Sequence, residues 1–151
     1  MSRIDFYHLQ KQSLEDVLPR LLLKAYETEK RIKILVGTPE RVDFLNSFLW
    51  TYEDESFLPH GSKKDGFSSA QPIYISSETD NPNNAEFLFL VDGAKISVED
   101  LSSFERVFNI FDGNSEESLS AAREFWKALK NSGAELHYWQ QNKVGKWEQK
   151  E

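Results

Sequence analysis

The chain has no cysteine among its 151 residues. This absence excludes a disulfide, a thiolate nucleophile and any metal site built on cysteine, and it is compatible with the reducing cytosol. Long apolar runs are absent too, and the first residues, MSRIDFYHLQKQ, carry charges where a signal peptide needs an unbroken apolar core. We therefore expect a soluble, cytoplasmic protein.

Positive charge is scarce. The chain has 18 Lys and Arg residues and 25 Asp and Glu residues, so the net charge is -7. Such a surface repels phosphates, which disfavours duplex binding and leaves any nucleic-acid role indirect or confined to a local patch. The 39% hydrophobic and 13% aromatic content at this length predicts one globular domain over residues 1–151.

Motifs that would mark an active site are also missing. The only glycine between the second predicted strand and its helix is Gly37, whereas a phosphate loop needs several glycines and a Lys-Ser/Thr pair. The three histidines, His8, His60 and His137, stand far apart without metal-ligand spacing, so structural or surface roles are favoured. No cofactor is expected, and an enzyme is the minority interpretation.

What the chain does have is an alternation of strand and helix patterns. Strands are predicted at residues 4–9, 31–36, 72–76, 87–91 and 106–111, and helices from Ser13, from Thr38-Pro39 and at residues 98–104. The apolar face of the second helix is assigned to Val42, Phe44, Leu45, Phe48 and Leu49. The alternation favours a single-domain, three-layer α/β fold with helices on both faces, its sheet mixed because of the closely spaced strands in the middle.

Three segments are less regular. Pro19 sits inside the first helical pattern and predicts either a kink or a later start. Residues 52–70, rich in charge, Ser and Gly, are expected to form a long connection with a short anchor at Phe57-Leu58-Pro59-His60. The tail predicts a hairpin in which Tyr138, Trp139 and Trp147 are in contact.

The segment 114–133 carries the strongest signal. It predicts a complete helix with Asn114 or Ser115 as N-cap and Gly133 as its stop. Spacings of three, four and seven set four residues along one side, namely Arg123, Trp126, Lys127 and Lys130. Three cations and an indole suit a short acidic ligand with an aromatic or carboxylate end. Spacing alone favours the plainer alternative, a solvated face with a half-buried tryptophan.

Several segments, in their order and approximate spacing, carry a family resemblance. They are Asp5-Phe6-Tyr7, Leu49-Trp50, Ser56-Phe57-Leu58-Pro59-His60, Pro72-Ile73-Tyr74-Ile75 and Ala122-Arg123-Glu124-Phe125-Trp126-Lys127-Ala128. With these segments the chain resembles the chi subunit of bacterial DNA polymerase III holoenzyme over nearly its whole length. Its ending, Tyr138-Trp139-Gln140-Gln141 and Gly145-Lys146-Trp147, is similar to the tail of chi proteins from alphaproteobacteria.

The resemblance implies a Rossmann-like fold and a non-catalytic accessory component of the clamp-loader assembly in DNA replication. Chi proteins bind the acidic C-terminal tail of single-stranded-DNA-binding protein, which ends in aspartates followed by a Pro-Phe carboxylate. Many also bind a small psi subunit that tethers them to the clamp loader. DNA would then be contacted only indirectly.

Carried over by position, the resemblance assigns roles on the 114–133 helix. Arg123 would hold the terminal carboxylate of the tail, Trp126 occupies an aromatic position that is usually Tyr, and Lys127 would meet the acidic run. Leu119 stands where some family members have a further lysine, and Lys130 could compensate from the next turn. Leu119, Phe125 and Trp50 are candidate walls for the terminal Phe.

Two other classes remain open. A direct binder of single-stranded nucleic acid would use Trp126, Trp139 and Trp147 as stacking platforms, but it also needs a basic groove. A small α/β enzyme acting on nucleotides or phosphoesters would fit the sheet, but it needs an anion site.

Overall fold

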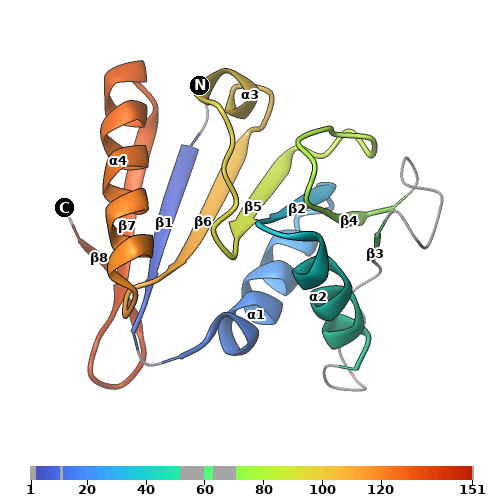
Figure 1. Cartoon of the computed structure of the whole chain (residues 1–151), viewed down its shortest axis with the longest axis horizontal. Helices are drawn as coiled ribbons and strands as arrows, with labels where there is room; N and C mark the ends of the chain where they lie inside the picture. Colours follow the sequence, from blue (N-terminus) through green and yellow to red (C-terminus); the bar gives the residue numbers. More distant parts are fainter. Residues whose placement is uncertain (1–2, 11, 52–59, 63–70, 151) are drawn as a thin grey trace.

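The computed structural model describes residues 3–10, 12–51, 60–62 and 71–150 (Figure 1). The strands are β1 (Arg3–Leu9), β2 (Ile32–Val36), β3 (Gly61–Ser62), β4 (Ile73–Ser76), β5 (Phe87–Val91), β6 (Arg106–Asp112), β7 (Glu135–Gln141) and β8 (Trp147–Lys150). The helices are α1 (Leu14–Tyr26), α2 (Pro39–Thr51), α3 (Val98–Leu101) and α4 (Glu116–Ser132).

The strands form one eight-stranded sheet in the order β3-β4-β2-β5-β6-β1-β7-β8. All neighbouring pairs are parallel except β7 and β8, which are antiparallel. The sheet is therefore mixed, but not where we expected, because β4 and β5 both pair with β2 in parallel from opposite sides. Their connection crosses β2, and the buried Asn83 fixes it there by donating to the backbone oxygens of Ile32 at 3.1 Å and Gln71 at 2.9 Å.

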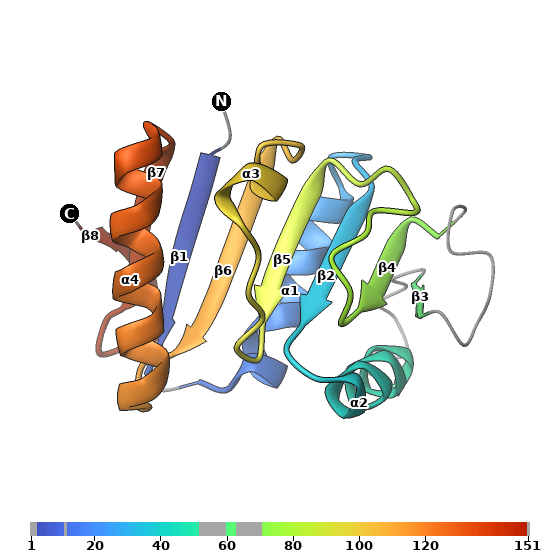
Figure 2. The same ribbon diagram turned by 45° about the horizontal axis from the view of Figure 1, so that its top comes forward.

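Helices cover both faces of the sheet, as the three-layer prediction required (Figure 2). Residues of α1 and α2 share one core with one set of strand side chains, including Leu18, Leu45 and Ile34. The other face packs against α3 and α4 through a second core that includes Phe6, Leu101 and Leu129. The architecture is consistent with a Rossmann-like α/β fold.

The winding reverses at β1. The helix after β1 lies on one face of the sheet, whereas the helix after the neighbouring β6 lies on the other. Such a reversal opens a crevice outside the carboxyl ends of the two strands. The carboxyl end of β1 and the start of α4 therefore lie at the natural ligand position of this fold class.

The amino end of α1 explains how Pro19 is tolerated. Ser13 accepts a hydrogen bond from the Asp16 backbone at 3.3 Å, and the Asp16 carboxylate accepts one from the Ser13 backbone at 3.2 Å. This capping box fixes the helix start at Leu14, so the later start considered for the proline is wrong. Pro19 lies within the helix and is buried.

Two sequence assignments were wrong in detail. Phe44 on α2 is 40% exposed rather than part of the core, and it lies beneath the Arg41 guanidinium and stacks on Phe48. In the tail hairpin, Tyr138 packs in the core on the α4 side whereas Trp139 packs on the α1 side, because successive side chains of a strand point to opposite faces. Tyr138 therefore does not share a contact cluster with Trp139 and Trp147.

The expected anchor at Phe57-Leu58-Pro59-His60 falls mostly outside the described residues. His60 is described and is buried, with its Nε2 atom 3.0 Å from the backbone oxygen of Asn46. Directly after it, Gly61–Ser62 adds the short strand β3 beside β4. We had not predicted this strand.

The N-cap of α4 provides a test of the fold. The Ser115 side chain accepts a hydrogen bond from the Ser118 backbone at 3.2 Å, which settles the N-cap as Ser115 rather than Asn114. Ser115→Ala should lower the free energy of unfolding by about 1 kcal/mol, measured by urea denaturation, because one donor of the first turn loses its partner. Ser120→Ala, an exposed site within the same helix, is the matched control. Equal losses in the two variants would contradict this assignment.

Candidate functional site

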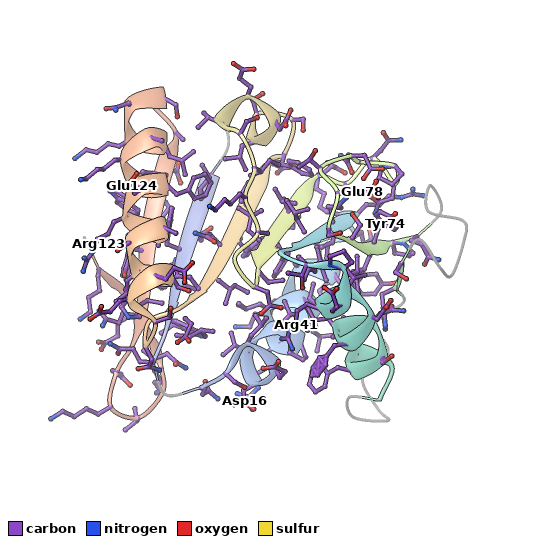
Figure 3. The ribbon with its side chains drawn as sticks, viewed as in Figure 1. Asp16, Arg41, Tyr74, Glu78, Arg123 and Glu124 are labelled. Carbon is purple, nitrogen blue, oxygen red and sulfur yellow. The ribbon has the colours of Figure 1, made fainter. Side chains whose placement is uncertain are left out.

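One flank of α4 carries the residues singled out from the sequence. We name this surface the α4 patch and define it as Leu119, Arg123, Trp126, Lys127 and Lys130. The three cations are exposed, whereas Leu119 and Trp126 are half-buried against the core beneath the helix. Figure 3 shows Arg123 projecting from the outer edge of α4. The helix therefore brings all five residues together at the predicted spacing.

Trp126 is anchored from below by aromatic rings. Its ring centroid lies 5.1 Å from that of Phe6 and 5.9 Å from that of Tyr138, both in edge-to-face arrangements. Phe6 and Tyr138 occupy paired positions on β1 and β7, so the sheet itself positions the indole. Trp126 is thus both a core residue and the apolar wall of the patch.

The three cations of the α4 patch are available to a ligand in the part of the chain that the structure describes. Within the described ranges, Arg123, Lys127 and Lys130 form no ion pair with a carboxylate. Glu124, the neighbour of Arg123 in sequence, lines a cavity on the opposite flank of the helix. The guanidinium of Arg123 therefore keeps its paired donors available for an incoming carboxylate.

His8 and Tyr138 lie next to the patch and were missed from the sequence. The Nδ1 atom of His8 is 2.6 Å from the Tyr138 hydroxyl oxygen, and His8 is buried. Burial lowers the pKa of His8, and the charge of Arg123 lowers it further, against an opposing effect of Asp112. Burial also raises the pKa of Tyr138. The His8 imidazole and the Tyr138 hydroxyl that lie beneath Arg123 are therefore neutral.

These two residues were missed because the sequence does not show that β1 pairs with β7, which joins distant parts of the chain.

A large cavity of about 1170 Å³ opens on the other flank of α4, at the carboxyl ends of β1, β5 and β6. None of the α4 patch residues lines it. Among the residues that the structure describes, its walls carry five carboxylates and two basic residues, namely Glu15, Asp92, Asp112, Glu117, Glu124, Arg41 and Lys95. Arg41 is already paired, at 2.7 Å to Glu15 and 2.9 Å to Asp92. An acidic lining of this kind does not suit the phosphate that an enzyme of nucleotide chemistry must hold.

The structure separates the three candidate walls for the terminal Phe. Phe125 points inward, with its ring centroid 5.8 Å from that of Phe6, and lines the acidic cavity. The side chain of Trp50 falls outside the described residues. Of the candidates whose side chains the structure describes, Leu119 lies on the patch flank, and its contact with the core supports an apolar role there. No described helix is long and apolar enough to cross a bilayer.

The lowered pKa of His8 predicts a pH dependence of stability. Below the ordinary pKa of 6.5, His8 binds a proton more readily in the unfolded chain than in the folded chain. The contribution of His8 to the free energy of unfolding is therefore complete above pH 6.5 and falls as the pH decreases. The stability advantage of the parent over His8→Gln should therefore shrink between about pH 7.5 and about pH 5.5 in urea denaturation. Taking the difference cancels the other titrating groups. A constant difference would show that His8 titrates alike in both states.

Comparisons with known proteins identify the family of the chain. The family model described as DNA polymerase III chi subunit, HolC, matches residues 1–137. A protein of Rickettsia prowazekii (strain Madrid E), named "Probable DNA polymerase III subunit chi", is 33% identical over 156 residues, which cover 97% of this chain and 91% of the relative. The match includes the whole of α4 and its patch. The chain belongs to the DNA polymerase III chi subunit family.

Proposed function

We propose that this chain is a non-catalytic accessory subunit that links the replicative polymerase to coated single-stranded DNA in the cytoplasm. It does so by binding the acidic C-terminal tail of single-stranded-DNA-binding protein at the α4 patch. The observation that carries the proposal is the uncommitted Arg123 beside the half-buried Trp126 on one helix flank. Membership of the chi family supports the polymerase assembly as its setting.

The binding steps follow from the charges and burial of the patch. Lys127 and Lys130 are exposed, so they attract the aspartates of a disordered tail. Arg123 then binds the terminal carboxylate through two parallel hydrogen bonds and fixes the register. The terminal Phe packs against Trp126 and Leu119, whose lower surfaces already rest on the core.

The net charge of -7 contributes selectivity. Most of the surface repels free DNA, whereas a short peptide needs only one small basic region. At the α4 patch, DNA would then be reached through its coat protein. The clamp loader would be reached through a separate surface, by a psi subunit where the cell makes one.

The free carboxylate of the tail is the first test. A peptide of aspartates followed by Pro-Phe should bind the chain, and amidation of its C-terminus should weaken binding by about 1.5 to 3 kcal/mol, roughly ten- to a hundredfold, because the charge gripped by Arg123 is lost. Fluorescence anisotropy of labelled peptides measures both affinities. Equal affinity for the acid and the amide would refute the assignment of Arg123.

Substitution of Arg123 is the second test. Arg123→Ala should weaken peptide binding at least roughly tenfold, because it removes the charged hydrogen bonds to the terminal carboxylate. The free energy of unfolding should change by no more than about 0.5 kcal/mol, because the side chain is exposed. It should also raise the pKa of His8, which Arg123 holds down; NMR titration reports this shift. Arg20→Ala, at an exposed position on α1, is the matched control. Loss of stability with binding retained would make Arg123 a structural residue.

A further inference from the structure

A second basic and aromatic surface lies on the opposite face of the sheet. There, beside the flank of α1, a groove of about 360 Å³ opens over β1, β6 and the β7-β8 hairpin. We name it the cation-aromatic groove and define it by six of its lining residues, Arg3, Tyr7, Lys24, Arg106, Trp139 and Trp147. Nothing in the proposed tail interaction uses these residues.

A buried carboxylate organises the groove. Asp5 is fully buried, and its oxygens accept hydrogen bonds from Arg106 Nε at 2.9 Å, Trp139 Nε1 at 2.9 Å and Arg3 Nη2 at 3.2 Å. A buried charge held by three donors fixes the orientation of each donor. Two guanidiniums and an indole are thus set in place before any ligand arrives.

The groove is positive although the protein is acidic. Among the described residues, the lining of the groove contains three cations, Arg3, Lys24 and Arg106, and no carboxylate. Beneath the lining, the buried Asp5 pairs with both arginines, and the more exposed Glu135 lies 3.9 Å from Arg3 Nε. Within the described residues, Asp5 engages only the Nε atom of Arg106, so the two outer nitrogens of that guanidinium have no carboxylate partner. Arg106 also lies over the Phe108 ring, 4.5 Å from its centroid, which holds it flat. Flat guanidiniums with spare donors are suited to phosphate.

Aromatic rings form the other half of the groove. Tyr7 and Trp139 are nearly parallel, with centroids 6.3 Å apart, and Trp147 meets Tyr7 edge-on at 5.1 Å. Burial and the charge of Asp5 raise the pKa of Tyr7 to about 12, so its hydroxyl keeps its proton. Half-buried indoles beside fixed cations make a stacking platform next to an anion site.

We propose that the cation-aromatic groove binds one nucleotide unit, with its base stacked on the tryptophans and its phosphate held by Arg3, Arg106 and Lys24. The volume is at the small end of ligand sites, about 300 to 1,000 Å³, which suits one unit rather than a long strand. An aspartate-rich peptide would meet the cations but has no flat ring for the indoles. Of the three proposed stacking tryptophans, Trp126 is excluded because it packs on the other face.

The unit comes from either a free nucleotide or a single strand, which share this chemistry. We favour a single strand as the source. If this protein is bound to single-stranded-DNA-binding protein on DNA, exposed nucleotides lie nearby at a high effective concentration. That use depends on the proposed tail interaction, but nucleotide binding itself does not. Failure of one leaves the other intact.

The NMR signals of the tryptophan indole N–H groups test the site, because Trp126 serves as an internal control in the same sample. The full chain, labelled with ¹⁵N, is titrated with 5′-phosphorylated oligothymidylate and separately with thymidine monophosphate. The signals of Trp139 and Trp147 should shift saturably, while that of Trp126 stays in place. Tighter binding of the oligonucleotide points to a strand, and equal binding points to a free nucleotide. Unmoved Trp139 and Trp147 signals, or displacement of the oligonucleotide by an aspartate-rich peptide, would overturn the proposal.

Two matched substitutions locate the phosphate contact. Lys24→Gln should weaken oligonucleotide binding. It should also reduce the slope of the logarithm of the binding constant against the logarithm of the salt concentration by about one, the value expected for one lost phosphate contact. Lys130→Gln makes the same change on the α4 patch and should leave oligonucleotide binding unchanged. Both side chains are exposed, so neither change threatens the fold. Equal weakening by the two substitutions would assign the effect to overall charge and overturn the site.

The stacking contact has its own pair of variants. Trp147→Leu should weaken oligonucleotide binding roughly five- to a hundredfold, the range expected for loss of one stacked base. Trp147→Phe should restore most of the affinity, whereas a packing role would be met nearly as well by Leu. Thermal unfolding of both variants checks the fold, and the acidic peptide should bind both like the parent. Equal oligonucleotide affinity for the Leu and Phe variants would refute stacking.

Discussion

The pleat of β1 is the constraint on which both candidate surfaces depend. β1 lies between β6 and β7, so each of its side chains meets partners from distant parts of the sequence. Phe6 and His8 point toward α4, where they support Trp126 and contact Tyr138. Asp5 and Tyr7 point to the opposite face, where they set Trp139 and the guanidiniums. A register shift of one residue would exchange these sets and destroy both surfaces together.

Much of this fold was accessible from the sequence because its signals are local. The caps of α1 and α4, the helical spacing of the α4 patch and the continuous apolar strands all depend on residues close together in the chain. Gly133, at φ 80°, ends α4 as the pattern indicated. Two features that were missed depend on distant pairing instead. The crossing of β2 held by Asn83 and the strand β3 require knowledge of which strands are neighbours. The division of Tyr138 from Trp139 is different, because it follows from the alternation of side chains along a single strand.

The candidate site divides along the same line. The resemblance and the helical period together placed Arg123, Trp126, Lys127 and Lys130 on one flank, and the structure keeps them there. What could not be predicted is the support under them. His8 gave no signal because a lone histidine is usually structural, and its contact with Tyr138 spans 130 positions. The role of Leu119 also becomes clearer, since its contact with the core favours an apolar wall over a position for a basic side chain.

The two flanks of α4 carry opposite charge, and this asymmetry gives the proposed tail a direction. The cations lie on the outer flank, whereas Glu117 and Glu124 face the acidic cavity on the inner one. An acidic peptide that moved across the helix would meet these carboxylates, and repulsion between like charges would disfavour that position. If the proposed peptide binds the α4 patch, the acidic cavity would confine it to the outer flank, where Arg123 can reach its end. A small basic patch thus becomes specific through the acidic surface beside it.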